Sequence, residues 1–115
     1  MSVASVFSES LRVALERLPQ DEWAVVRARD AATQGLSPSD AFSNIVEVLD
    51  LATKQNDSYA FASCCWVALA LAKLSNTTEQ PKGLETVLAR AEGQAQNLGC
   101  TKELAEVRAW FRIAA

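Results

Sequence analysis

Apolar residues recur every three or four positions along most of this 115-residue chain, which is the spacing that lines one face of an α-helix. The pattern predicts six helices, separated by prolines, glycines and short polar stretches. They are expected over residues 3–18, 19–34, 38–55, 58–74 and 81–98, and from residue 101 onward. No segment combines alternating apolar and polar residues with the glycine-containing turns that mark strands, so we expect an all-α fold.

The expected helix ends rest on residues with known end preferences. Pro19 should end the first helix and set the first turn of the second, because its ring fixes φ and removes the backbone N–H. Gly35 should end the second helix in a left-handed conformation. Ser37 and Pro38 form the clearest helix start, since serine caps and proline fits the first helical position. Asp57 is expected to cap the fourth helix.

The segment 58–74 differs from the others because it carries no charge before Lys73. A helix that is apolar all round lies either at the centre of a fold or in a membrane. This uncharged stretch is shorter than the ~20 residues that a bilayer requires, so we expect a central helix and no membrane partner. The prediction is about six short antiparallel helices, paired as three hairpins around this helix, in a bundle or a helical-repeat-like stack. The W-x₂-L-G-x₂-Y pattern of tetratricopeptide repeats is missing.

Composition narrows the class of protein. The length fits one domain over residues 1–115, with a net charge of −3 and eleven scattered Lys and Arg residues. Without a basic face, a nucleic-acid partner is not expected. The three cysteines are an odd number, and two of them are adjacent, which is unlike a secreted disulfide framework. Because Glu9 and Arg12 interrupt any apolar leader, the expected location is the cytoplasm.

Catalytic and cofactor motifs are absent from the sequence. The chain has no histidine, so Ser-His-Asp catalysis, Cys-His catalysis and His-ligated zinc are excluded. It also lacks a phosphate-binding loop and a dinucleotide-binding glycine motif, so no cofactor, metal or enzymatic activity is expected. Cys64 and Cys65 should be inert core residues. Cys100, which precedes a helix start, is the better candidate for a reactive thiol, because a helix N-terminus lowers the thiol pKa.

Two surfaces are candidates for binding a partner. Asp40, Glu47 and Asp50 share the polar face of the third predicted helix, with Lys54 one turn beyond Asp50. This face is either an acidic recognition stripe, an ordinary solvated face with an Asp50–Lys54 pair, or, least favoured, a carboxylate catalytic pair.

The second candidate surface is an edge of the central helix. Tyr59 and Trp66 recur there at helical spacing, together with Ser63, Ala70 and Lys73. Core packing is the ordinary explanation for such residues. If neighbouring helices leave this edge open, the two aromatic side chains become partner-binding anchors, because Trp and Tyr are favoured at binding hot spots.

The leading hypothesis is a non-enzymatic protein–protein interaction domain, a small acidic inhibitor of the bacterial immunity-protein type that binds a basic toxin or effector. Charge complementarity would speed and orient such binding. The alternative is a helical-repeat adaptor or secretion chaperone that binds a peptide, for which stacked hairpins would be required. An enzyme that uses carboxylates alone is the third possibility, and homodimerisation stays open.

Overall fold

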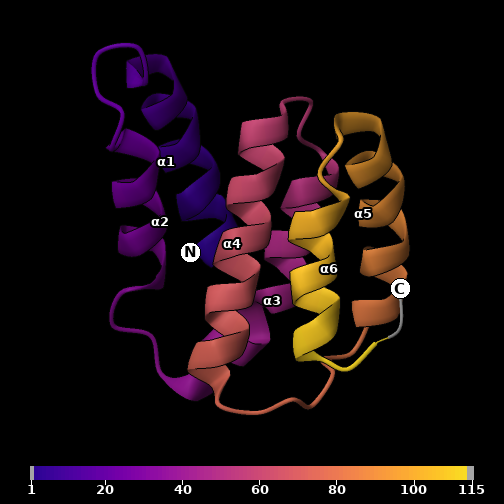
Figure 1. Ribbon diagram of the computed structural model, residues 1–115. Helices are drawn as coiled ribbons and strands as arrows, with labels where there is room; N and C mark the ends of the chain where they lie inside the picture. Colours follow the sequence, from indigo (N-terminus) through magenta and orange to yellow (C-terminus); the bar gives the residue numbers. More distant parts are fainter. Residues whose placement is uncertain (1, 114–115) are drawn as a thin grey trace.

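The computed structural model describes residues 2–113 and contains six helices over that range. They are α1 (Val3–Arg17), α2 (Ala24–Thr33), α3 (Pro38–Thr53), α4 (Ser58–Ser75), α5 (Leu84–Leu98) and α6 (Thr101–Trp110). Consecutive helices pair as three antiparallel hairpins (Figure 1). The predicted all-α fold is confirmed. Residue 1 and residues 114–115 of the predicted domain lie outside the described residues.

The three hairpins stack side by side in chain order. Helix α3 packs between α1 and α5 in one layer, and α4 packs between α2 and α6 in the other (Figure 1). Within residues 2–113, the two outer hairpins each pack on α3–α4 and make no extensive contact with one another. The molecule measures 39 × 33 × 19 Å, and its smallest dimension fits two layers of helices about 10 Å apart. With a radius of gyration of 13.2 Å the molecule is a compact all-α bundle, in which the hairpins follow one another in chain order.

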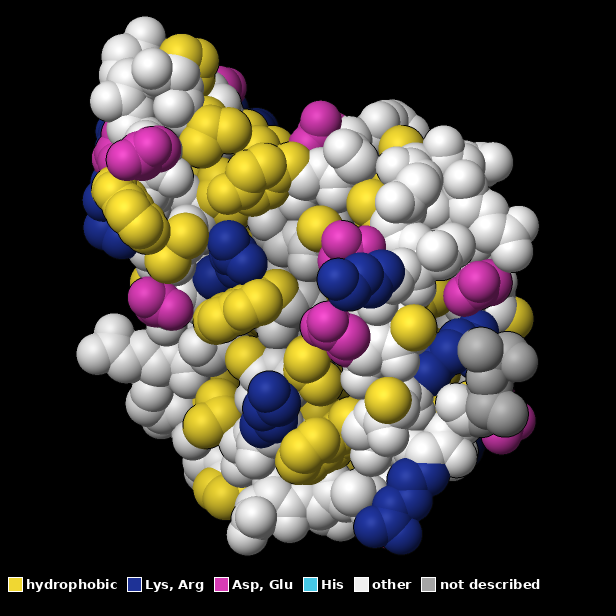
Figure 2. All heavy atoms as spheres, in the orientation of Figure 1, with side chains coloured by type: hydrophobic (Ala, Val, Ile, Leu, Met, Phe, Trp, Pro, Cys, Tyr) yellow, Lys and Arg dark blue, Asp and Glu magenta, His cyan; other side chains and the backbone are white. Residues whose placement is uncertain are grey.

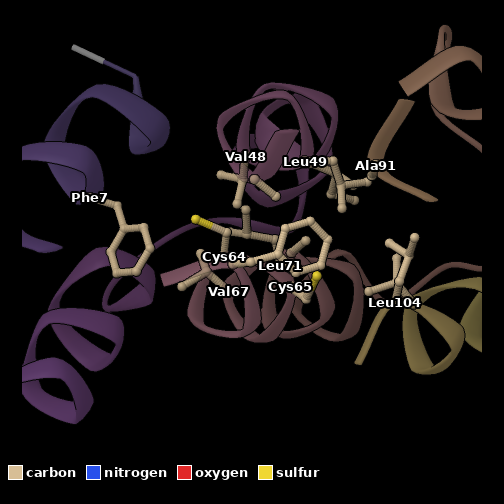
Figure 3. Packing of buried hydrophobic residues seen from close by; sticks show 14 of the residues in the cluster. Phe7, Val48, Leu49, Cys64, Cys65, Val67, Leu71, Ala91 and Leu104 are labelled. Carbon is tan, nitrogen blue, oxygen red and sulfur yellow. The ribbon is translucent and has the colours of Figure 1, made fainter. Parts of the chain in front are cut away.

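Helix α4 is the hub of the core, as its composition predicts. It packs on α3 along its length, on α2 at one side and on α5 and α6 at the other, and its inward side chains belong to one core that also includes Phe7 of α1 (Figure 3). The buried α4 residues are Ala60, Phe61, Ser63, Cys64, Cys65, Val67, Ala68, Leu71, Ala72 and Ser75. By length and composition α4 is also apolar enough to cross a membrane, but 56% of it is buried inside the fold, as in the core helix of a globular protein.

Two helix starts follow the predicted capping. The Ser37 hydroxyl accepts a hydrogen bond from the Asp40 backbone N–H at 3.1 Å, and the Asp57 carboxylate accepts one from the Ala60 N–H at 2.9 Å. Each satisfies an N–H that has no partner within its helix. Gly35 has the expected left-handed φ of +75° after α2.

Two other helix starts are later than predicted. Helix α2 begins at Ala24 rather than at Pro19, and α5 begins at Leu84 rather than at Pro81. After Pro19 the N–H groups of Gln20 and Asp21 turn back to the Arg17 carbonyl. Before α5, Gly83 adopts φ +87°, which is incompatible with a continuous right-handed helix. Both prolines therefore introduce a turn, and the helix starts after it.

Candidate interaction surface

The outer edge of α4 is open. Helix α3 lies behind α4, and α2 and α6 flank it, so one side faces solvent. Tyr59 remains 39% exposed and Trp66 42% exposed. Of the other residues predicted for this edge, Lys73 is exposed and Ala70 is half-buried, but Ser63 is buried. The hypothesis of an open edge therefore describes the position of Tyr59 and Trp66, and it is wrong for Ser63.

The side chains that line this edge of α4 follow a regular spacing. Tyr59, Ala62, Trp66, Leu69 and Lys73 are separated alternately by three and four residues, and each is exposed or half-buried. A stripe with this spacing stays on one face of a helix over four turns. Figure 2, which views the α2–α4–α6 layer, shows apolar side chains gathered along α4 with isolated charges among them.

Two shallow hollows lie along the junction of α4 and α6, which we call the α4–α6 seam. The upper hollow, about 440 Å³, is lined by Arg29, Ser58, Tyr59, Ala62, Leu98, Gly99, Cys100 and Glu103. The lower hollow, about 550 Å³, is lined by Leu69, Lys73, Glu106, Ala109 and Trp110. Because Tyr59 and Ala62 line the upper hollow and Leu69 and Lys73 line the lower one, both open on the same face of α4.

The charges beside the seam differ in sign between its two sides. Arg29 of α2 and Lys73 of α4 lie on one side, and Glu103 and Glu106 of α6 lie on the other. None of these four side chains is in an ion pair in the part of the chain that the structure describes. The Arg29 guanidinium carbon lies 5.0 Å from the centre of the Trp66 ring, which is cation–π distance. Arg29 therefore borders the aromatic anchor.

In the fold, basic side chains neutralise part of the predicted acidic stripe on α3. The Asp50 carboxylate pairs with Lys54 at 3.2 Å, as the spacing indicates, and also with Arg90 of α5 at 3.1 Å. Glu47 is exposed and shares with Asp50 the lining of a separate hollow of about 540 Å³ on the α1–α3–α5 side. Asp40 is exposed at the start of α3 and is not part of that lining.

The three thiols are free and buried. Burial raises the pKa of the Cys64 thiol to about 12 and raises the pKa of the Cys65 thiol further. The expectation of a lowered pKa at Cys100 is wrong. Although Cys100 precedes α6, burial raises its thiol pKa first, and the nearby charges of Glu103 and Asp57 raise it as well. The helix dipole is thus outweighed by desolvation and by two carboxylates.

Neither a search for metal-binding clusters in residues 2–113 nor comparison with known proteins identifies another functional site. No group of three or more His, Cys, Asp or Glu side chains in residues 2–113 converges as a metal site. Comparisons of the chain with protein-family models, curated proteins and solved structures find no match.

Sequence reasoning missed the other residues that build the seam. Arg29, Glu103, Glu106 and Trp110 come from two helices that are distant from α4 in sequence. The helical periodicity of α6 does indicate that Glu103 and Glu106 share one side of it, because they are three residues apart. The chain offers no local signal that this side borders α4.

Proposed function

We propose that this chain is a non-enzymatic protein-binding module, an adaptor of three stacked helical hairpins that takes its partner on the α2–α4–α6 layer. The observation that carries the proposal is the open edge of the hub helix. Trp66 and Tyr59 stay substantially exposed on the most apolar helix of the fold. Aromatic side chains and Arg are enriched at interface hot spots, and Arg29 lies over the Trp66 ring.

The stacked order of the hairpins supports an adaptor over a compact inhibitor. Arrays of stacked helical hairpins present extended binding surfaces, since each unit contacts only its neighbours. The α2–α4–α6 layer forms such a surface, with the two hollows of the α4–α6 seam along it. In this proposal Trp66 and Tyr59 supply most of the affinity, and the flanking charges orient the partner.

An immunity-type inhibitor of a basic toxin or effector is the second candidate. It would use the acidic side of α3, where Asp40 and Glu47 are exposed. Asp50 contributes less, because Lys54 and Arg90 both neutralise it. Opposite-sign contacts at Asp40 and Glu47 would mainly raise the association rate.

The test uses protein fragments from the source organism, displayed on phage and selected on the immobilised protein. Fragments enriched on the wild type should be lost, by tenfold or more, on Trp66→Ala and Tyr59→Ala. Trp23→Ala is the matched control, because Trp23 is 60% exposed and lines neither hollow of the seam. Circular dichroism checks that each variant folds.

A triple reversal of Asp40, Glu47 and Asp50 to Lys separates the two candidates. If it abolishes capture while Trp66→Ala leaves capture unchanged, the partner binds the acidic side of α3 and the adaptor surface is wrong. Capture that depends equally on Trp23 and Trp66 would indicate nonspecific adhesion of exposed aromatic side chains and would also reject the proposal.

A further inference from the structure

We propose that the α4–α6 seam holds an amphipathic α-helix of the partner, with basic side chains on the edge that faces α6. This inference rests on the proposed function and specifies the partner chemistry at the same surface. It follows from the spacing, the length and the charges of the seam.

The α4 stripe has the residue spacing that is typical of contacts between two helices. Tyr59, Ala62, Trp66, Leu69 and Lys73 alternate by three and four residues, as do the positions that form the contact of two helices in a coiled coil. On α6, Glu103, Glu106 and Trp110 repeat the same alternation. Two parallel stripes of this kind form a groove into which the side chains of a third helix interdigitate.

The length of the seam fits a short helix. From Tyr59 to Lys73 the α4 stripe spans fourteen residue steps, or about 21 Å at 1.5 Å per residue. A partner helix of about fourteen residues matches this length and reaches both hollows. Small residues, Ala62 and Gly99 in the upper hollow and Ala109 in the lower one, leave room for the partner's larger apolar side chains.

The backbone of this surface excludes a partner that binds as an added strand. Such a peptide gains most of its affinity from hydrogen bonds to the open edge of a sheet. Residues 2–113 contain no strand, and the helices satisfy their own backbone groups. The surface must therefore be recognised through side chains, as in grooves that bind an amphipathic helix.

The charges beside the seam determine which edge of the bound helix is basic and which is acidic. Glu103 and Glu106 border the seam on the α6 side, and the basic residue nearest to them in sequence on α6, Lys102, lines neither hollow. Arg29 and Lys73 border the opposite side. A helix in the seam is therefore matched by Lys or Arg along its α6 edge and by Asp or Glu along its α4 edge.

The experiment is a selection from a displayed library of eighteen-residue helical peptides. The scaffold carries an apolar stripe at alternating spacings of three and four, and each flanking position is Lys, Glu or Gln. A second library has the same composition with central prolines that prevent helix formation. Both are selected on the wild type, on Glu103→Lys/Glu106→Lys, on Trp66→Ala and on the control Glu22→Lys/Glu85→Lys. The control makes the same change in net charge at two exposed residues that line neither hollow of the seam.

On the wild type and the control we expect helical peptides with Lys along one edge to be enriched at least tenfold over their Glu counterparts. The Glu103→Lys/Glu106→Lys protein should reverse that preference at the same edge. Enrichment of the proline-containing peptides, or an unchanged preference after the reversal, overturns this inference but leaves the proposed function standing if Trp66→Ala abolishes binding. Enrichment that is insensitive to Trp66→Ala overturns both proposals. No enrichment at all overturns this inference alone, because the proposed function is decided by the selection of protein fragments.

Discussion

At the scale of single residues, the start of a helix can be predicted from the sequence where a single side chain caps it. Ser37 and Asp57 each accept a hydrogen bond from the backbone N–H three residues ahead. The donor, the acceptor and the turn lie within four residues, so the sequence alone contains the whole interaction. Pro19 and Pro81 are less informative, because a proline is equally compatible with a turn and with the first position of a helix.

The cap of α4 gives the first prediction. Asp57→Ala removes the acceptor for the Ala60 N–H and should lower the free energy of unfolding by about 1 kcal/mol, measured by urea denaturation. Asp57→Asn keeps an acceptor and should cost much less. Asp30→Ala, an exposed change within α2, should stay within about 0.5 kcal/mol of the wild type. Equal stability of Asp57→Ala and the wild type would show that the cap does not hold α4.

The buried thiol of Cys64 predicts a pH dependence of stability. In the unfolded chain a cysteine loses its proton near pH 8.5, whereas burial raises the pKa of Cys64 in the fold to about 12. Between these values the native state binds the extra proton, so the free energy of unfolding falls as pH rises. From pH 8 to pH 10 the wild type should lose about 1–2 kcal/mol more than Cys64→Ala. Parallel pH curves for the two proteins would contradict this, whatever their absolute stabilities.

Long-range pairs mark the limit of prediction at this scale. The sequence indicates the Asp50–Lys54 pair, because four residues bring two side chains together on a helix. It does not indicate Arg90, which reaches Asp50 from α5. It also predicts the wrong direction for the pKa of the Cys100 thiol, which burial and the charges of Glu103 and Asp57 raise. Both depend on how α5 and α6 pack, which no local pattern records.

At the scale of elements, composition identifies α4 as the hub but does not say which of its sides stays open. A helix whose only charge is near its end is expected to be buried, and ten residues of α4 are buried. Both Phe61 and Trp66 are aromatic residues of this helix, yet Phe61 is fully buried and Trp66 faces solvent. The difference arises because α2 and α6 flank α4 without covering its outer edge.

This difference can be measured as a contrast between two substitutions. Phe61→Ala leaves a cavity between α4 and its neighbours and should cost about 3–5 kcal/mol. Trp66→Ala removes a half-exposed ring and its contact with Arg29 and should cost only about 1 kcal/mol. Denaturant unfolding with an unchanged m-value is the measurement. A cost at Trp66 as large as that at Phe61 would mean that the outer edge of α4 is covered, and the interaction surface would then be wrong.

At the scale of the whole molecule, the order of the hairpins is the feature that the sequence leaves open. Periodicity predicts six helices, and short connections predict antiparallel neighbours, but a closed bundle and an open stack have the same helices and the same turns. The contacts give the order of the hairpins: α3–α4 is the middle unit, and within residues 2–113 each outer hairpin packs mainly on it. The binding surface depends on this order, because closing the helices into a bundle would bury the edge that carries Trp66.

A stack of this kind should lose its structure from its ends. In stacked repeats each unit is stabilised by its neighbours, so the middle hairpin has two stabilising interfaces and each outer hairpin has one. Native-state hydrogen exchange should therefore protect α3–α4 most strongly, with α1–α2 and α5–α6 opening separately at lower free energy. Phe7→Ala, at a fully buried position of α1, should speed exchange in α1–α2 and leave α5–α6 unchanged. Leu104→Ala, its counterpart in α6, should do the reverse. If either substitution speeds exchange equally in both outer hairpins, the molecule unfolds as one closed unit, and the stacked arrangement on which the adaptor surface rests is wrong.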